Sequence, residues 1–114
     1  MDRVTSVDDR ILNGIVQTIV NESDPERVML FGSRVSGAFG DDSDVDLIVA
    51  ETEPFHRDRS RRREMARLWT ALAQYGVAKD ILVFSLDEVD RWRDSLNHVL
   101  ARALRQGRVL YERP

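Results

Sequence analysis

The sequence contains no cysteine. This absence excludes disulfide bonds, thiolate metal sites and a cysteine nucleophile. No apolar segment approaches the ~20 residues that a membrane-spanning helix needs, and no apolar core of an export signal stands at the amino end. We therefore expect a cytoplasmic protein with no membrane partner.

The chain also lacks a strong overall charge. Its formal net charge is −3 over 114 residues, and 42% hydrophobic and 32% charged residues are ordinary values for a soluble domain. This length suits one hydrophobic core and is too short for a second, so we expect a single domain covering residues 1–114. The weak net charge hides local blocks, because four aspartates lie within residues 41–46 and six arginines within residues 57–67.

The arginine block at 57–67 has two interpretations. Its members could form the solvated side of a helix, or they could be a docking surface for phosphate, nucleic acid or an acidic partner. The sequence does not decide between the two, and nothing else in it predicts direct DNA binding.

Hydrophobic periodicity predicts helices and strands in a mixed order. Apolar residues recur at helical spacing in three long segments, while short apolar runs bounded by turn residues are typical of strands. The expected order is helix 6–24, strand 27–31, a loop with a short helix at 34–39, strand 44–49, helix 57–75, strand 77–84, helix 85–106 and strand 108–112. This order predicts an α/β (α+β) fold, a small mixed β-sheet with helices packed on it.

The helix predicted at 57–75 carries an apolar stripe. Met65, Leu68, Trp69 and Leu72 recur at helical spacing and form this stripe. Trp69 on this stripe, and Trp92 on that of the last helix, are expected in the core or at an interface. Gly76 follows the helix and is expected to close it as a C-terminal glycine cap.

The most unusual stretch is residues 32–50, GSRVSGAFGDDSDVDLIVA, in which several acids adjoin an apolar run. Three known motifs fail here. The P-loop spacing exists from Gly32 to Gly37, but the required Lys and Ser or Thr do not follow, and the glycines do not have the spacing of a dinucleotide fingerprint. A calcium loop would need a glycine at its sixth position, where Leu47 opens the apolar run.

Strand alternation offers a reason for two of these acids. Asp44 and Asp46 point to the same face of the predicted strand, together with Ile48. Two carboxylates this close repel each other unless a cation lies between them, and oxygen-only ligands favour Mg²⁺ or Mn²⁺. Asp80 interrupts the next apolar strand, and it can join the pair if the two strands are neighbours in the sheet.

The loop before these acids has the composition of a phosphate site. Gly32 allows a tight turn, and Ser33 offers a hydroxyl and a backbone N–H at the start of the short helix predicted at 34–39. Ser33 could also be a simple N-cap, and Arg34 could either neutralise a phosphate or lie in solvent.

The spacing of these residues resembles the signature of the DNA polymerase beta-type nucleotidyltransferase superfamily, in particular its minimal nucleotidyltransferase branch: Gly32-Ser33, ten intervening residues, Asp44-x-Asp46, and Asp80 in a later strand. The resemblance implies the polymerase-beta-type nucleotidyltransferase fold and an activity that transfers AMP from ATP to a hydroxyl acceptor. It also implies that Asp44, Asp46 and Asp80 are the catalytic residues and bind Mg²⁺ or Mn²⁺. The expected nucleotide-binding residues are Gly32, Ser33, Arg34 and Ser43.

The resemblance further implies a protein partner. Minimal nucleotidyltransferases are commonly paired with a HEPN-domain toxin and act as its antitoxin, and some transfer AMP to a tyrosine of the toxin. Larger relatives carry a second domain that binds the acceptor, for which this chain has no room. We therefore expect a hetero-oligomer or a homodimer. The alternatives are transfer to a small molecule or an RNA end, and a non-catalytic module that neutralises a toxin by binding.

Overall fold

The computed structural model of the chain describes residues 9–31, 45–76, 79–93 and 99–114. The start of the first predicted helix and the short helix predicted at 34–39 lie outside these ranges. Among the described residues, no helix has both the length and the apolar character needed to cross a membrane.

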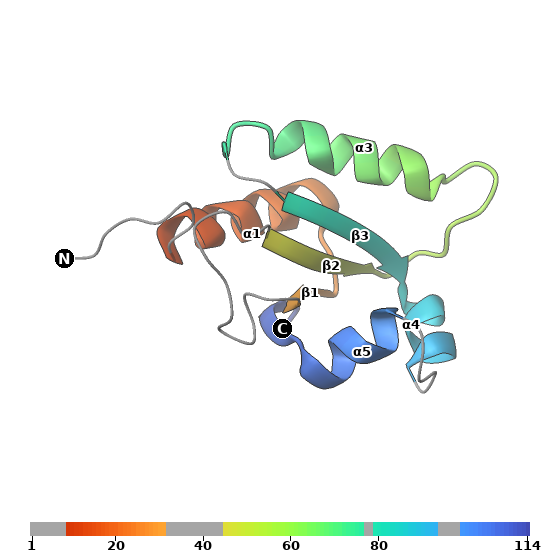
Figure 1. Cartoon of the computed structure of the whole chain (residues 1–114). Helices are drawn as coiled ribbons and strands as arrows, with labels where there is room; N and C mark the ends of the chain where they lie inside the picture. The colour runs from red at the N-terminus through yellow and green to blue at the C-terminus, as the bar shows by residue number, and fades with distance from the viewer. Residues whose placement is uncertain (1–8, 32–44, 77–78, 94–98) are drawn as a thin grey trace.

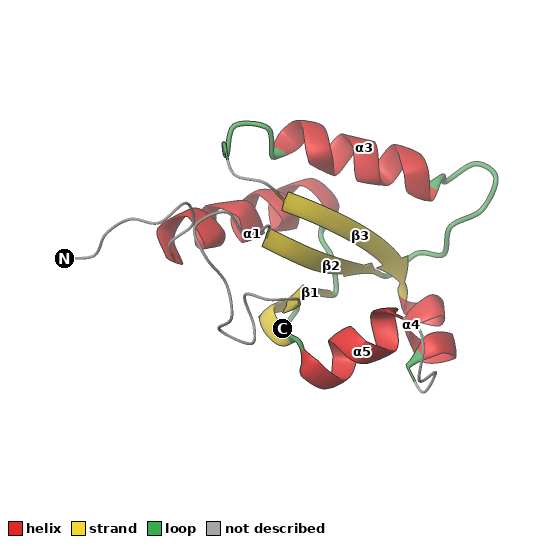
Figure 2. Ribbon diagram, viewed as in Figure 1, coloured by secondary structure: helices red, strands yellow, loops and turns green. Residues whose placement is uncertain are grey.

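The described elements follow the predicted order with one exception, at the last helix (Figure 1, Figure 2). They are α1 (Asp9–Ser23), β1 (Arg27–Phe31), β2 (Val45–Glu51), α3 (Arg61–Ala71), β3 (Lys79–Ser85), α4 (Leu86–Trp92), α5 (Val99–Gln106) and β4 (Arg108–Glu112). The strands form a four-stranded sheet in the order β3-β2-β1-β4. Because β1 is antiparallel to β2 and β4 while β2 and β3 run parallel, the predicted small mixed sheet is confirmed.

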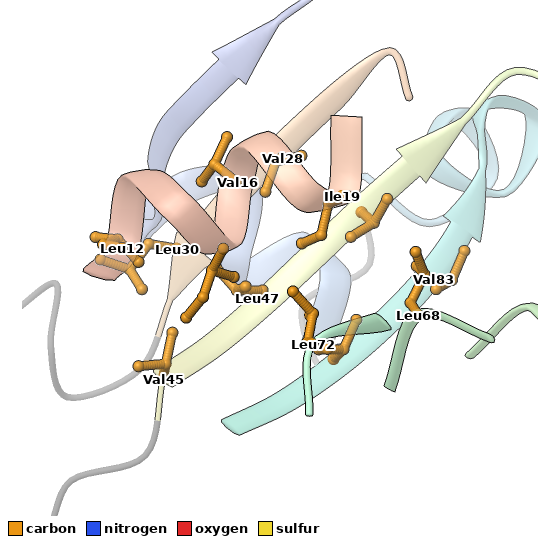
Figure 3. Close-up of a cluster of buried hydrophobic side chains, with 13 residues drawn as sticks. Leu12, Val16, Ile19, Val28, Leu30, Val45, Leu47, Leu68, Leu72 and Val83 are labelled. Carbon is orange, nitrogen blue, oxygen red and sulfur yellow. The ribbon is translucent and has the colours of Figure 1, made fainter. Parts of the chain in front are cut away.

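Helices cover both faces of this sheet, with α1 and α3 on one face and α4 and α5 on the other (Figure 1). The α1/α3 face holds the larger core, where alternate strand residues meet apolar side chains of both helices (Figure 3). Burial of this apolar surface is the main force that holds the layers together. The buried members are Leu12, Ile15, Val16, Ile19, Val28, Leu30, Val45, Leu47, Val49, Leu68, Leu72, Ile81 and Val83.

The α4/α5 face carries a smaller core. Ile48 and Ala50 of β2 pack there against Val89 of α4, with Phe84 of β3 partly buried beside them. Since side chains alternate along a strand, Asp46 belongs to this same face. The predicted side for Asp46 and Ile48 is therefore confirmed.

The start of α3 corrects the helix predicted at 57–75. α3 begins at Arg61, because Ser60 is its N-cap and the Ser60 hydroxyl accepts a hydrogen bond from the N–H of Arg63 at 3.3 Å. Residues 56–59 instead form a tight turn, in which the backbones of His56 and Arg59 bond to each other in both directions at 3.0 Å.

The end of α3 corrects the predicted glycine cap. The helix ends at Ala71, and the N–H of Leu72, its C-cap, bonds to the carbonyl of Leu68 at 3.0 Å. Gly76 lies beyond this end and does not have the positive φ that a glycine cap requires.

The buried stripe of α3 is narrower than its sequence spacing indicates. Leu68 and Leu72 are fully buried, but Trp69 is 46% exposed. One side of α3 packs against the sheet and α1, and the other side faces solvent. Only the side chains on the packed side are therefore buried.

The helix predicted at 85–106 is two helices, which is a correction. α4 ends at Trp92 with Arg93 as its C-cap, and α5 begins at Val99. The two helices pack against each other. The sequence between them contains aspartate, serine and asparagine, residue types that compete with a helical backbone for hydrogen bonds, and apolar periodicity alone does not register them.

Candidate active site

Two of the predicted site residues meet at one end of the sheet. Asp46 of β2 and Asp80 of β3 are register partners in the parallel pair. Neighbouring strands lie about 4.8 Å apart, and side chains that are directly opposed point to the same face. β3 thus lies beside β2, which is the condition for Asp80 to join the acids that precede it in the sequence.

The surroundings of the two carboxylates differ. Asp80 is exposed, and Asp46 is partly buried. Next to them on the same face lie Ile48 and Leu82, which belong to the smaller core. The pair therefore stands where the apolar face meets solvent, a position that a charged ligand can reach from outside.

The segment expected to hold the nucleotide joins the sheet at this same end. Phe31, the last residue of β1, is the register partner of Asp46. Val45, the first residue of β2, is the register partner of Lys79. The predicted site residues that lie outside the described ranges are Gly32, Ser33, Arg34, Ser43 and Asp44.

The donor atoms at this end of the sheet suit a hard divalent cation. Asp46 and Asp80 offer carboxylate oxygens, the ligands that Mg²⁺ and Mn²⁺ prefer. Within the described residues no group of three or more His, Cys, Asp or Glu side chains could hold a metal ion. Asp44, the expected third ligand, stands just outside those residues, so the described pair fits two ligands of a larger set.

Sequence reasoning did not single out Lys79, the neighbour of Asp80 in β3. Lys79 is 8% exposed, and its Nζ donates to the carbonyl of Tyr75 at 2.8 Å. The ammonium also lies 5.6 Å from the centre of the Trp69 ring. Strand alternation could have identified it, because Lys79 shares its face with the buried Ile81 and therefore points away from the acidic pair.

The arginine block at 57–67 divides into members with and without an ion pair among the described residues. Arg57, Arg62 and Arg63 are exposed and have no ion pair there. The ion pairs of the other three tie the segment before α3, and α3 itself, to β2, α4 and α1: Arg59 with Glu51, Arg61 with Glu88, and Arg67 with Glu22 and Glu64. Three of the six arginines thus form ion pairs within the protein. The block as a whole is therefore neither only a solvated helix side nor only a docking surface.

A known protein family matches most of the length of the chain. Residues 13–114 match the family described as polymerase beta, nucleotidyltransferase. A search among curated proteins finds no significant match.

Solved structures include chains of similar fold. A candidate nucleotidyltransferase from Sulfolobus solfataricus has a TM-score of 0.60 and 18% identity, over 91% of this chain and 79% of its own. A chain from a toxin–antitoxin complex with AMP-PNP has a TM-score of 0.53 and 20% identity, over 88% and 73%. A chain from a mutant of the toxin–antitoxin pair MntA–HpeT has a TM-score of 0.53 and 22% identity, over 90% and 72%. At these identities the likeness shows a shared fold.

Proposed function

Because the chain belongs to the polymerase beta nucleotidyltransferase family, we propose that it transfers AMP from ATP to a hydroxyl of a partner protein. The acceptor is a tyrosine of a HEPN-domain toxin, and the modification neutralises that toxin. The observation that carries the proposal is the direct opposition of Asp46 and Asp80 on adjacent parallel strands. This register sets two carboxylate ligands side by side at the end of the sheet, the donor type that Mg²⁺ and Mn²⁺ prefer.

The roles of the acids follow from their positions. Asp46, the partly buried member, is the better fixed of the two and holds the metal–nucleotide together with Asp44. Asp80, the exposed member, faces the side from which an acceptor arrives, so it binds a cation and can take the proton of the acceptor hydroxyl. A bound Mg²⁺ or Mn²⁺ supplies positive charge against the triphosphate and the developing charge of the leaving group.

The covalent change is a single displacement at phosphorus. The acceptor oxygen forms a bond to the α-phosphorus of ATP, and the bond from that phosphorus to the bridging oxygen breaks, which releases pyrophosphate. The hydroxyl proton leaves to Asp80 or to water. Gly32, Ser33, Arg34 and Ser43 hold the phosphates, since their segment joins the sheet at Phe31 and Val45, beside the acidic pair.

The solved structures of similar fold support a protein acceptor, because they include chains of toxin–antitoxin complexes, one of them with AMP-PNP.

The test uses the whole chain and the protein encoded by the neighbouring reading frame. The two proteins are incubated with Mg²⁺ and ATP labelled in parallel reactions at the α- or the γ-phosphate. Transfer of AMP predicts label in the partner from the α-position only, with a tyrosine identified as the modified residue by mass spectrometry. Label from the γ-position only would instead indicate transfer of a phosphoryl group, and covalent label from both positions would indicate attachment of the intact triphosphate.

Variants of the acidic pair distinguish catalysis from binding. Asp46→Asn and Asp80→Asn should each lower labelling on the order of 100-fold or more, while Asp58→Asn, an exposed acid in the turn before α3, should leave it unchanged. If both site variants still neutralise the partner fully, the chain acts as a non-catalytic binding module and the proposal is wrong. Label found only on added RNA or small molecules would identify a different acceptor.

A further inference from the structure

A carboxylate is buried at the opposite end of β2 from the acidic pair. Glu51 is the last residue of this strand, and its side chain is 4% exposed. By strand alternation it shares the α1/α3 face with Leu47 and Val49, both fully buried in the larger core. Burial of an ionised carboxylate is costly unless its oxygens are well partnered.

Only one oxygen of Glu51 has a partner within the described residues. Its Oε1 accepts a hydrogen bond from Nη2 of Arg59 at 2.7 Å, whereas its Oε2 is buried without one. The Arg59 guanidinium is also shared, because its Nε lies 3.5 Å from Glu53 and its centre lies 4.4 Å from the middle of the Phe55 ring. Arg59 therefore compensates Glu51 only in part.

A second carboxylate lies within hydrogen-bonding reach of Glu51. Glu64 of α3, whose side chain is 11% exposed, is the neighbour. Two ionised carboxylates are both acceptors, so they cannot bond to each other. Once Glu51 carries a proton, its buried oxygen gains a partner, because the acid can donate to Glu64.

Glu64 has its own cation. Glu64 accepts from Nη2 of Arg67 at 2.8 Å, and Nη1 of Arg67 also holds Glu22 of α1 at 2.9 Å. Because Arg67 favours the ionised form of Glu64, this carboxylate can accept a hydrogen bond from a protonated Glu51.

The other charged side chains near Glu51 either form ion pairs of their own or face solvent. Glu51 itself lines a surface hollow of about 370 Å³, together with Ser23, Asp24, Thr52, Glu53, Arg59 and Arg113. Arg113 is paired with Glu26 at 2.6 Å and with Asp24 at 3.3 Å. The Glu53 side chain is 77% exposed, so water screens it.

We propose that Glu51 is a protonated acid below neutral pH, that it donates to Glu64, and that this shared proton is a pH-sensitive latch between β2 and the first half of α3. Burial, and then the hydrogen bond to Glu64, raise the pKa of Glu51 to about 7, although Arg59 opposes the rise. Burial would raise the pKa of Glu64 too, but the hydrogen bonds from Glu51 and Arg67 outweigh it and lower that pKa. The proton therefore resides on Glu51.

The direction of the latch follows from these shifts. When α3 lifts from β2, Glu51 becomes solvated and returns to an ordinary carboxyl pKa. The closed state then binds more protons than the open state between that ordinary value and about 7. Opening becomes easier as pH rises through this window and does not change further above it. Leu68 and Leu72 still anchor the second half of α3 in the larger core, so the latch controls only the first half.

The test follows the carboxyl groups and the amides of the wild-type chain. A ¹³C NMR titration should give a midpoint near 7 for Glu51. Hydrogen-exchange protection of amides in the first half of α3, corrected for intrinsic exchange rates, should fall on the order of tenfold from pH 5.5 to 7.5.

The variant Glu51→Gln supplies the decisive comparison. Its amide N–H₂ can donate to Glu64 at every pH, so its α3 protection should be independent of pH. Asp90→Asn, at an exposed acid of α4 on the other face of the sheet, should behave like the wild type. Glu64→Gln should lower the Glu51 midpoint, because the neighbouring negative charge is gone. An ordinary Glu51 midpoint in the wild type, or the same pH-dependent loss of protection in Glu51→Gln, would overturn the proposal.

Discussion

Asp46 of β2 and Asp80 of β3 are directly opposed across a pair of parallel strands. Like charges in this arrangement lower the stability of a sheet. Both residues lie on the face that carries Ile48 and Leu82, so an apolar residue would fit either position. If the pair binds a metal ion, as proposed, the stability of the protein should depend on both carboxylates and on Mg²⁺.

Removal of one charge of the pair should stabilise the protein in the absence of metal. We expect Asp80→Asn to raise the free energy of unfolding by about 0.5 kcal/mol in chelator, because the repulsion with Asp46 is lost. Urea denaturation in EDTA and in Mg²⁺ measures this, and Mg²⁺ should stabilise the wild type more than the variant. Asp58→Asn is the matched control, and equal stabilisation of all three proteins by Mg²⁺ would contradict a metal role for the pair.

The contact between Gly14 and Tyr75 should make α1 intolerant of a methyl group. A Cβ at Gly14 would lie 2.9 Å from Cε1 and from the hydroxyl oxygen of Tyr75, which also hydrogen-bonds Thr18 at 3.0 Å. Gly14→Ala should therefore destabilise the fold by about 1–3 kcal/mol in urea denaturation.

Two further variants separate this clash from helix propensity. In a Tyr75→Ala background the same Gly14→Ala change should become favourable, by up to about 1 kcal/mol, because alanine is the better helix former. Gly76→Ala, where an added Cβ meets nothing within 4 Å, should be close to neutral. A Gly14→Ala effect that is the same with and without the Tyr75 ring would refute the contact.

The two neighbouring residues Leu68 and Trp69 should respond very differently to truncation. Leu68→Ala should cost about 2–5 kcal/mol, because the side chain is fully buried in the larger core. Trp69→Ala should cost less than about 1.5 kcal/mol, because the ring is 46% exposed and mainly loses a cation–π contact with the Lys79 ammonium. Thermal and chemical denaturation of the two variants test the narrow buried stripe of α3, and similar losses would contradict it.

The free energy of unfolding of the whole chain should depend on pH through Glu51. Its pKa is raised in the folded state from 4.5 to about 7, so its contribution is complete below 4.5 and is lost as pH rises through 7. The loss amounts to at most about 3 kcal/mol. The difference in unfolding free energy between the wild type and Glu51→Gln, measured at pH 5 and at pH 8, isolates this contribution from the other acids, and a constant difference would exclude it.

The sequence by itself was sufficient for the order of the described elements up to the last predicted helix and for the face on which Asp46 lies. Both depend on local periodicity, because the side chains of a strand alternate and those of a helix repeat every three to four residues. β1 was predicted with its observed bounds, since turn residues delimit a short apolar run. The break between α4 and α5 was missed because apolar spacing continues across it, although polar residues in between favour turns.

The tertiary structure alone decided which distant residues meet. That Asp80 stands opposite Asp46 depends on the parallel register of β2 and β3, and that Arg67 reaches Glu22, 45 residues away, depends on the packing of α3 against α1. The partnership of Glu51 with Arg59 has the same origin, because it depends on how the turn before α3 lies against the end of β2. Such contacts join segments whose separation along the chain carries no periodic signal, so composition and spacing identified the charged residues but not their partners.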